Sequence, residues 1–270
     1  MKVYEINPLG RQEITTEVWN FPGGEVGVKL KVKDSGNAFN VEYTDPKNDN
    51  ILVLLNILDS LKRQGVDKRS ITVFMPYLPY ARQDRVCHEG ESFALDVFLK
   101  VLATGYFSGL HVYDLHSDVS VKLIRGYMPD VLFLHAPQHH LLTDKVYGFD
   151  YVVAPDKGAE SKAQNVALVM GTELIQMYKT RVDGQVVYAQ SDTHIAYKGK
   201  ALVVDDICDG GATFLALAKV LKDRNPELEL SLYVTHGIFS KGVDELLKNY
   251  ATIYTANLIN KSVSNQVKEI

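Results

Sequence analysis

Cysteine is scarce in this 270-residue sequence, which contains only Cys87 and Cys208. Two cysteines are too few for a disulfide framework, and this usage favours a reducing compartment. Basic charge is limited as well, since the net charge is −4 and the pI is about 6.1. That balance excludes a general electrostatic attraction to nucleic acid, so any phosphate-bearing partner must be met by a local site.

Long apolar runs are also missing. No segment approaches the ~18 apolar residues of a membrane span, and the first residues lack the apolar stretch of a signal peptide. We therefore expect a cytoplasmic protein (in the host cytoplasm if the source is viral) with no membrane or nucleic-acid partner.

The residues that are present suit an ordinary globular protein, with 46% hydrophobic and 23% charged residues. Short apolar runs alternate with stretches of helical periodicity along most of the chain. This alternation predicts an α/β fold with parallel sheets covered on both faces. The expected strands lie at 70–75, 110–115, 131–136, 150–155, 200–206 and 230–236, and the expected helices at 51–65, 94–102, 158–170 and 214–221.

The first ~45 residues differ from the rest, because residues 13–19, 25–32 and 38–43 alternate between apolar and polar at period two, as antiparallel strands do. They predict an N-terminal antiparallel flap. Strands followed by an acidic residue and a turn occur in both halves of the chain, and residues near 136–140 are the best candidate for a boundary. We therefore predict two similar domains, residues 1–136 and 137–270.

The segment VVDDICDGGAT combines two acids at a strand's carboxyl end with a Gly-rich turn that opens a helix. A turn at a helix N-terminus presents unpaired backbone N–H groups to an anion, and glycine permits a close approach. Asp205 and Asp206 could accept hydrogen bonds from the hydroxyls of a ribose. The alternative is a plain strand–turn–helix with a capping acid and a solvated acidic pair. The residues that would wrap a phosphate are Asp209, Gly210, Gly211, Ala212 and Thr213.

VVDDICDGGAT resembles the ribose-phosphate loop of type I phosphoribosyltransferases and of the ribose-phosphate pyrophosphokinases, which make phosphoribosyl pyrophosphate (PRPP). Five further segments resemble the pyrophosphokinases specifically and stand in that family's order: residues 48–65, PYLPYARQDR at 76–85, YDLHS at 113–117, VAPDKGAESKA at 153–163 and THGIFSKG at 235–242. The resemblance implies two phosphoribosyltransferase-like domains, the first with the ATP-site segment and the second with the ribose-phosphate loop. It also implies transfer of diphosphate from Mg-ATP, the co-substrate, to ribose 5-phosphate, which gives PRPP and AMP.

The same resemblance implies roles for residues of the ATP site. Arg82 and Gln83 match residues that contact the ATP phosphates and adenosine. His116 matches a catalytic histidine that helps to hold Mg-ATP, and Asp156 matches an acid associated with Mg²⁺. Mg²⁺ prefers oxygen ligands, so a carboxylate or a bridging water suits it better than a direct histidine contact. We interpret the remaining histidines of this region as loop residues, not as a metal cluster: His135, His139 and His140.

Two further matches concern catalysis and assembly. Lys179 and Arg181, in MYKTRVDGQ, match the catalytic Lys-x-Arg of the family's mobile loop, although a generic solvated hairpin is the alternative. Phe21 and Glu25 match a segment that a neighbouring subunit lends to the ATP site, although Phe21 has the alternative of a core position. The resemblance thus implies a homo-oligomer, a dimer or a hexamer, with an ATP site shared between subunits.

Four positions depart from the family pattern. Gly23 and Cys87 stand where acidic residues are usual, Gly210 replaces a hydroxyl residue, and Ala212 replaces a glycine. Because Gly210 removes one donor and opens space, the acceptor could be a larger derivative of ribose 5-phosphate such as ADP-ribose, which would place the enzyme in NAD salvage. The sequence also leaves open a catalytically weak regulatory homologue and a phosphoribosyltransferase that uses PRPP without ATP.

Overall fold

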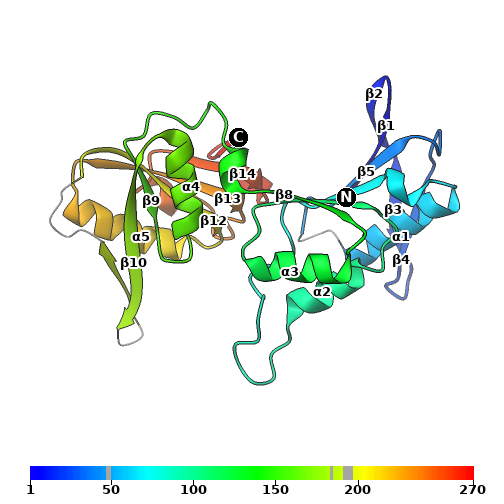
Figure 1. The fold of residues 1–270 in the computed structure, drawn as a ribbon, viewed down its shortest axis with the longest axis horizontal. Coiled ribbons are helices and arrows are strands. Elements are labelled where there is room, and N and C mark those ends of the chain that lie inside the picture. Colours follow the sequence, from blue (N-terminus) through cyan, green and yellow to red (C-terminus); the bar gives the residue numbers. More distant parts are fainter. Residues whose placement is uncertain (47–49, 183–184, 191–196) are drawn as a thin grey trace. The chain divides into compact units, whose positions relative to one another are not determined.

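The structure is a computed structural model that describes residues 1–46, 50–182, 185–190 and 197–270. Within the hairpin formed by residues 173–190 it describes the side chains of residues 173–179 and of Tyr188. The chain divides into two compact units, residues 1–136 and 137–270, each with its own buried hydrophobic clusters (Figure 1).

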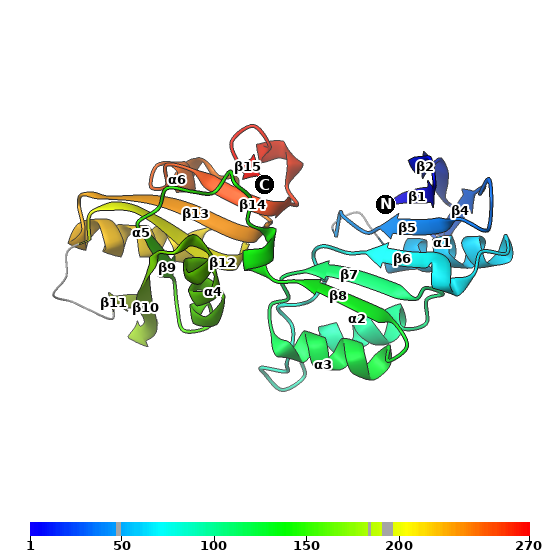
Figure 2. The ribbon, with the colours of Figure 1, turned by 45° about the horizontal axis from the view of Figure 1, so that its top comes forward.

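Unit 1 is built on a six-stranded sheet in which four parallel strands continue into an antiparallel pair. The parallel part carries α1 (Ile51–Arg63), α2 (Ala94–Leu102) and α3 (Asp118–Tyr127) in its connections. Figure 2 shows α2 and α3 together on one side of β7 and β8. In sheet order, the strands are β2 (Gly10–Ile14), β1 (Lys2–Asn7), β5 (Ala38–Glu42), β6 (Ile71–Phe74), β7 (Gly109–Tyr113) and β8 (Leu132–Ala136).

The antiparallel character of the first 45 residues is confirmed, but the strands are divided differently from the prediction. Residues 13–19 do not form one strand: β2 ends at Ile14, and a second strand, β3 (Thr16–Asn20), pairs with β4 (Val26–Leu30) in a separate hairpin. β5 is antiparallel to β1 on one side and parallel to β6 on the other. This strand therefore joins the flap to the parallel sheet.

Unit 2 contains a seven-stranded sheet that is parallel except for one antiparallel edge pair, β10 and β11. Its helices are α4 (Glu160–Met170), α5 (Ala212–Arg224) and the short α6 (Asp244–Leu247). In sheet order, the strands are β11 (Gln185–Gln190), β10 (Glu173–Val182), β9 (Tyr151–Ala154), β12 (Gly199–Cys208), β13 (Leu228–Gly237), β14 (Ile253–Leu258) and β15 (Lys268–Glu269).

The sheet of unit 2 is covered on both faces, as the continuous apolar runs of its strands predict. Ala201 and Val203 of β12 pack in one buried cluster with Leu217 and Leu221 of α5. The alternate residues Leu202 and Val204 pack in another cluster that includes residues of α4. The predicted α/β class with parallel sheets is thereby confirmed. Short 3-10 turns complete the elements: η1 (Lys68–Ser70), η2 (Gln138–Leu141) and η3 (Lys261–Val263).

Two details of the predicted helices need correction. The side chain of Asn50 caps α1 by accepting the Leu52 N–H at 2.8 Å. The sequence pattern indicates Asn48 or Asp49 as the cap, and both lie outside the described residues. In α2, the helical spacing of apolar residues predicts an inward stripe of Ala94, Val97, Phe98, Val101 and Leu102. Val97 is instead 54% exposed, whereas Leu95 and Leu99 are fully buried. The helix is apolar on more than one side, so its partners rather than its sequence decide which side faces the core.

Candidate functional site

The pleat of β12 separates its two adjacent acids. Successive residues of a strand point to opposite faces, and Val203 and Val204 already lie in different clusters on the two sides of the sheet. Asp206 follows on the α4 side, whereas Asp205 lies near Tyr188 and Cys208, whose thiol pKa its charge helps to raise. The two carboxylates therefore have different surroundings, which a reading of the motif as a simple pair does not reveal.

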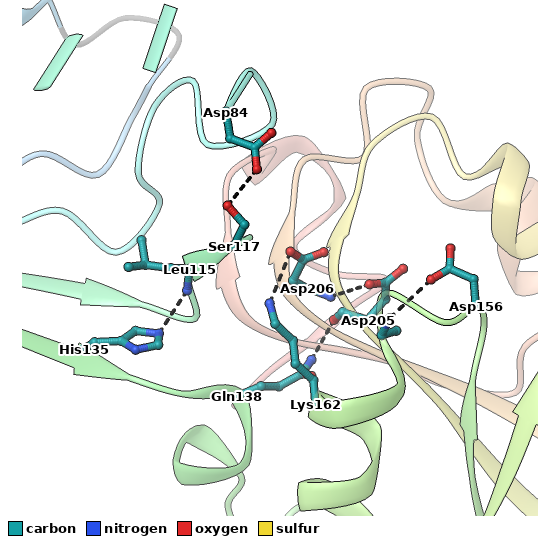
Figure 3. Close-up of polar contacts among 10 residues, drawn as sticks. Asp84, Leu115, Ser117, His135, Gln138, Asp156, Lys162, Asp205 and Asp206 are labelled. Carbon is teal, nitrogen blue, oxygen red and sulfur yellow. Dashed lines mark hydrogen bonds and ion pairs between the residues drawn. The ribbon is translucent and has the colours of Figure 1, made fainter. Parts of the chain in front are cut away.

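Asp206 is held by a lysine that the sequence interpretation missed. Lys162 Nζ lies 3.3 Å from Asp206 Oδ2, with the two side chains 23% and 9% exposed (Figure 3). Lys162 belongs to the first turn of α4, where the helix dipole disfavours a cation. The ion pair with Asp206 explains why a lysine is placed there. The segment VAPDKGAESKA contained this lysine, but only the fold shows which acid it meets.

Loss of this lysine should destabilise unit 2. In Lys162→Met, the Asp206 carboxylate stays buried without its cation, so we expect the free energy of unfolding to fall by about 2 kcal/mol. Urea titration of both proteins measures this. The double variant Lys162→Met/Asp206→Asn carries no unpaired charge and should recover most of the loss. A double variant no more stable than the single one would contradict a paired role for Lys162.

Asp205 is fixed through its backbone and through its neighbour. The Gln138 side chain donates from Nε2 to the Asp205 carbonyl oxygen at 2.6 Å, and the Asp206 N–H donates to Asp205 Oδ1 at 2.9 Å (Figure 3). Gln138 is itself 1% exposed, and its carbonyl accepts the Tyr233 hydroxyl at 3.1 Å. Burial, followed by the negative charge of Asp206, raises the pKa of Asp205 well above its usual range. A cation or a hydroxyl donor beside this carboxylate would relieve that cost.

Asp156 follows β9, the neighbour of β12 in the sheet, and its charge also acts on Asp205. Its Oδ1 accepts the N–H groups of Gly158 and Ala159 at 2.9 and 3.2 Å, so the side chain shapes the entry to α4. Within the described residues both of these bonds fall on Oδ1, which leaves Oδ2 for a cation. Asp156 therefore holds the turn that precedes α4 and also lies beside the acidic pair.

The Gly-rich turn opens α5 in the way that anion binding requires. Gly211 is the N-cap residue at φ +79°, and among the described residues no side-chain hydrogen bond caps the helix there. Thr213 and Phe214 of the first turn are held from behind, since their carbonyl oxygens accept the hydroxyls of Tyr188 at 3.3 Å and Tyr250 at 2.8 Å. Asp209 is tied to the turn that follows β13, because its Oδ1 accepts the Ser240 hydroxyl at 2.6 Å.

Lys179 lies in a hairpin, the shape that the sequence left open as an alternative. β10 pairs antiparallel with β11, and Lys179 stands directly opposite Tyr188. Directly opposed residues of antiparallel strands share a face. Exposed Lys179 therefore emerges on the face from which buried Tyr188 reaches Thr213. Burial, with the charges of Asp156 and Asp205, raises the pKa of Tyr188 to about 12. Arg181 is in the same strand, but its side chain lies outside the described residues.

In unit 1 the expected ATP segments come together at the carboxyl ends of β6 and β7. Asp84 Oδ2 accepts the Ser117 hydroxyl at 2.7 Å, which joins residues 76–85 to residues 113–117 (Figure 3). Asp84 is 4% exposed, and hydrogen bonds from Arg85 hold its pKa below the ordinary value. The sequence interpretation missed both Asp84 and Ser117. They anchor the loop that exposes Arg82 and Gln83.

His116 is exposed beside this anchor, and its charge is one of the causes that lower the pKa of Asp84. The chain enters this corner through Asp114, a buried residue at φ +26°, a backbone conformation that is strained for a residue with a side chain. Leu115 N–H then donates to His135 Nε2 at 3.0 Å (Figure 3). His135 thus lies in strand β8, within the strand expected at 131–136, so its interpretation as a loop residue is wrong. Its ring fixes the turn that presents His116.

His139 and His140, which we interpret from the sequence as loop residues, lie in η2. Their ring centroids are 4.3 Å apart. No group of three or more His, Cys, Asp or Glu residues in the described part of the chain is arranged to hold a metal ion. This does not count against Mg²⁺, which usually takes one or two carboxylates and completes its shell with water and phosphate oxygens. Asp156 and Asp205 fit that pattern.

Phe21 is not a core residue, since it is 50% exposed at the tip of the β3–β4 hairpin. Its ring meets Trp19, itself 41% exposed, at a centroid distance of 5.8 Å. Glu25 lies in the same turn, and its carboxylate occupies the space where a Cβ on Gly23 would stand.

Cys87 is another position that departs from the family pattern. The N–H groups of Cys87 and His88 donate to Glu91 Oε2, both at 3.0 Å. An acid is therefore present beside Cys87, supplied by the following turn.

None of the helices in the described parts of the chain is long and apolar enough to span a membrane.

Comparison with known proteins covers almost the whole chain. Residues 6–105 match the family model described as the N-terminal domain of ribose phosphate pyrophosphokinase, and residues 139–268 match the phosphoribosyl transferase domain. The ribose-phosphate pyrophosphokinase of Pyrococcus abyssi is 31% identical over 254 residues, which are 93% of this chain and 86% of that protein. The enzyme of the same name from Thermococcus kodakarensis is 30% identical over 244 residues, 89% of this chain and 84% of that protein.

Among solved structures, the phosphoribosylpyrophosphate synthetase of Mycobacterium smegmatis superimposes with a TM-score of 0.78 at 24% identity. The match covers 95% of this chain and 86% of that one. At this identity the superposition concerns the fold, and it confirms the mixed α/β fold class expected from the sequence resemblance.

Proposed function

The chain belongs to the ribose-phosphate pyrophosphokinase family, and on that premise we propose that it transfers the β,γ-diphosphate of ATP to the anomeric hydroxyl of ribose 5-phosphate. The hydroxyl oxygen bonds to the β-phosphorus and loses its proton. The bond from that phosphorus to the oxygen bridging to the α-phosphate breaks, and AMP leaves beside PRPP. The observation that carries the proposal is identity of about 30% over nearly the full length of both chains.

The geometry of unit 2 supports its role as the acceptor site. The turn at residues 209–213 offers backbone N–H groups and the positive end of α5 to the 5-phosphate. Asp205 and Asp206 stand a few residues before it and accept the ribose hydroxyls. The first turn of α5 is fixed by Tyr188 and Tyr250, so the donors are oriented before the ligand arrives.

The ATP side of the reaction falls to residues of unit 1. Arg82, with its planar guanidinium, binds the phosphates, and Gln83 binds adenosine, both from a loop that buried Asp84 anchors. His116 completes this set. Phe21 and Glu25 lie on an exposed aromatic hairpin, which suits a segment lent to a second copy of the chain. The enzyme would then be a homo-oligomer, a dimer or a hexamer.

Mg²⁺ is the metal that Asp156 and Asp205 of unit 2 fit, because both supply carboxylate oxygens. For His116 of unit 1, a water-mediated contact with Mg-ATP suits the preference of the ion for oxygen ligands. When bound, the ion neutralises phosphate charge. Lys179 and Arg181 add positive charge where the diphosphate is transferred, and the position of Lys179 on the Tyr188 face of the hairpin agrees with this.

The larger acceptor suggested by Gly210 is not favoured. The space beside Gly210 is occupied by the side chain of Lys241, whose Cδ and Cε lie 3.4 and 3.5 Å from the position of a Cβ on Gly210. No opening for a diester is therefore gained by the glycine. The relatives are also named for ribose phosphate. A cytoplasmic location agrees with phosphorylated substrates and with two free cysteines, Cys87 and Cys208.

A panel of acceptors tests the proposal. The purified protein is mixed with Mg²⁺, ATP and either ribose 5-phosphate, ribose or ADP-ribose, and AMP is resolved by chromatography. We expect AMP and PRPP with ribose 5-phosphate, and only background AMP with the other two acceptors. Equal AMP formation with and without any acceptor would contradict diphosphate transfer. AMP formation with ADP-ribose alone would reassign the acceptor.

A further inference from the structure

The turn that follows β13 lies against the phosphate loop residue by residue. Ile238 and Phe239 donate their N–H groups to the Cys208 carbonyl oxygen at 2.9 and 3.1 Å. The next residue, Ser240, donates its hydroxyl to Asp209. Residues 238 to 240 therefore contact Cys208 and Asp209 in order along the chain. These hydrogen bonds hold the turn against one side of the phosphate loop.

Lys241 is the next residue of this turn, and the aliphatic part of its side chain lies beside Gly210. A Cβ on Gly210 would stand 3.4, 3.5 and 3.7 Å from Cδ, Cε and Cγ of Lys241. These are ordinary van der Waals separations, so a longer side chain at position 210 would displace the lysine. Gly210 and Lys241 are therefore complementary: the missing side chain of one makes room for the stem of the other.

This packing positions the Lys241 ammonium near the phosphate loop. Nζ is bonded to Cε, which lies 3.5 Å from the position that a Cβ on Gly210 would take. The backbone holds the residue from both sides, with Phe239 at φ +40° and Gly242 at φ +74°. Phe239 is fully buried, whereas the Lys241 side chain is exposed. A buried anchor thus presents an exposed cation beside the turn that opens α5.

We propose that Lys241 is a specificity residue that contacts the 5-phosphate of the acceptor and selects a terminal phosphate monoester. The proposal rests on the proposed function, which places the phosphate in the loop at residues 209–213. A monoester carries up to two negative charges near neutral pH and a diester carries one, so a point cation favours the monoester. The stem over Gly210 also closes the side through which a diester would continue.

Lys241→Met tests this, because methionine keeps an unbranched apolar stem without the charge. We expect the KM for ribose 5-phosphate to rise about tenfold, with the KM for ATP and kcat close to those of the unmodified enzyme. The conservative variant Lys241→Arg should keep a near-normal KM. Lys219→Met is the matched control, since Lys219 is an exposed lysine of α5 that pairs with Asp223 instead of the loop.

The packing of Lys241 against Gly210 allows a second, independent experiment. Gly210→Thr should raise the KM for ribose 5-phosphate in the unmodified enzyme by displacing the lysine, but should add little in the Lys241→Met background. Additive effects of the two substitutions would overturn the idea that position 210 acts through Lys241.

Equilibrium binding separates this inference from the proposed function. Calorimetric titration with ribose 5-phosphate, and with ribose as the phosphate-free probe, needs no turnover. Weaker binding of ribose 5-phosphate to Lys241→Met, with folding unchanged by circular dichroism, supports the phosphate contact even if no AMP is formed from ATP. Equal affinity of the two proteins for ribose 5-phosphate would overturn it, whatever the outcome of the acceptor panel.

Discussion

Replacing Lys179 with alanine should lower kcat about a thousandfold while the KM values for ATP and ribose 5-phosphate change little. The physical reason is that a cation on the hairpin is needed where charge redistributes during transfer, not where the ground-state substrates are held. An interaction made only in the transition state changes kcat and kcat/KM together. Steady-state assays of AMP release measure both quantities.

A second lysine of unit 2 provides the control. Lys198 is an exposed residue that pairs with Glu227 at 2.8 Å, so Lys198→Ala removes the same charge without touching the hairpin. It should turn over like the unmodified enzyme. If Lys179→Ala kept more than about a tenth of the activity, β10 and β11 would be a solvated hairpin without a catalytic task, which is the alternative that the sequence leaves open.

Replacing Gly211 with valine should strongly weaken acceptor binding. Gly211 adopts φ +79°, which costs a residue with a side chain about 2 kcal/mol. A Cβ there would also stand 3.2 to 3.3 Å from the side chain of Leu246. Both effects push the turn out of place, and a shift of about 1 Å in a preorganised site costs roughly a hundredfold. We therefore expect the KM for ribose 5-phosphate to rise by about that factor.

Backbone strain alone is controlled by Gly171→Val. Gly171 ends α4 at φ +67°, and no atom of the residues that the structure describes lies within 4 Å of the Cβ it would gain. This variant should lose a similar free energy of unfolding in urea but keep a normal KM for ribose 5-phosphate. A normal KM in Gly211→Val would show that the turn does not hold the acceptor.

The sequence was sufficient for the parallel core and for the family, because both depend on local signals. Buried parallel strands appear as apolar runs, and Gly211 at a strand–helix junction marks a tight turn that few other residues tolerate. The order of five motifs along the chain then pointed to one family, which the comparisons confirm.

The remaining features depend on partners distant in sequence. Lys162 is one of many helical lysines until the fold places it against Asp206, 44 residues away. The role of Lys241 similarly depends on its packing beside Gly210, and that of His135 on its hydrogen bond from the Leu115 N–H. The division of Asp205 and Asp206 between two faces follows from the pleat of a strand that the sequence predicts, but only the fold shows that α5 packs on one face and α4 on the other. Tertiary contacts of this kind leave no periodicity in the sequence.

The predicted roles of the site residues remain predictions, and one measurement addresses the reaction behind them. ATP labelled with phosphorus-32 in its β-phosphate is incubated with the enzyme, Mg²⁺ and ribose 5-phosphate, and the labelled products are separated. Transfer of the intact diphosphate predicts label in the sugar product and unlabelled AMP. Label recovered in ADP or in free pyrophosphate, with none on the sugar, would contradict it.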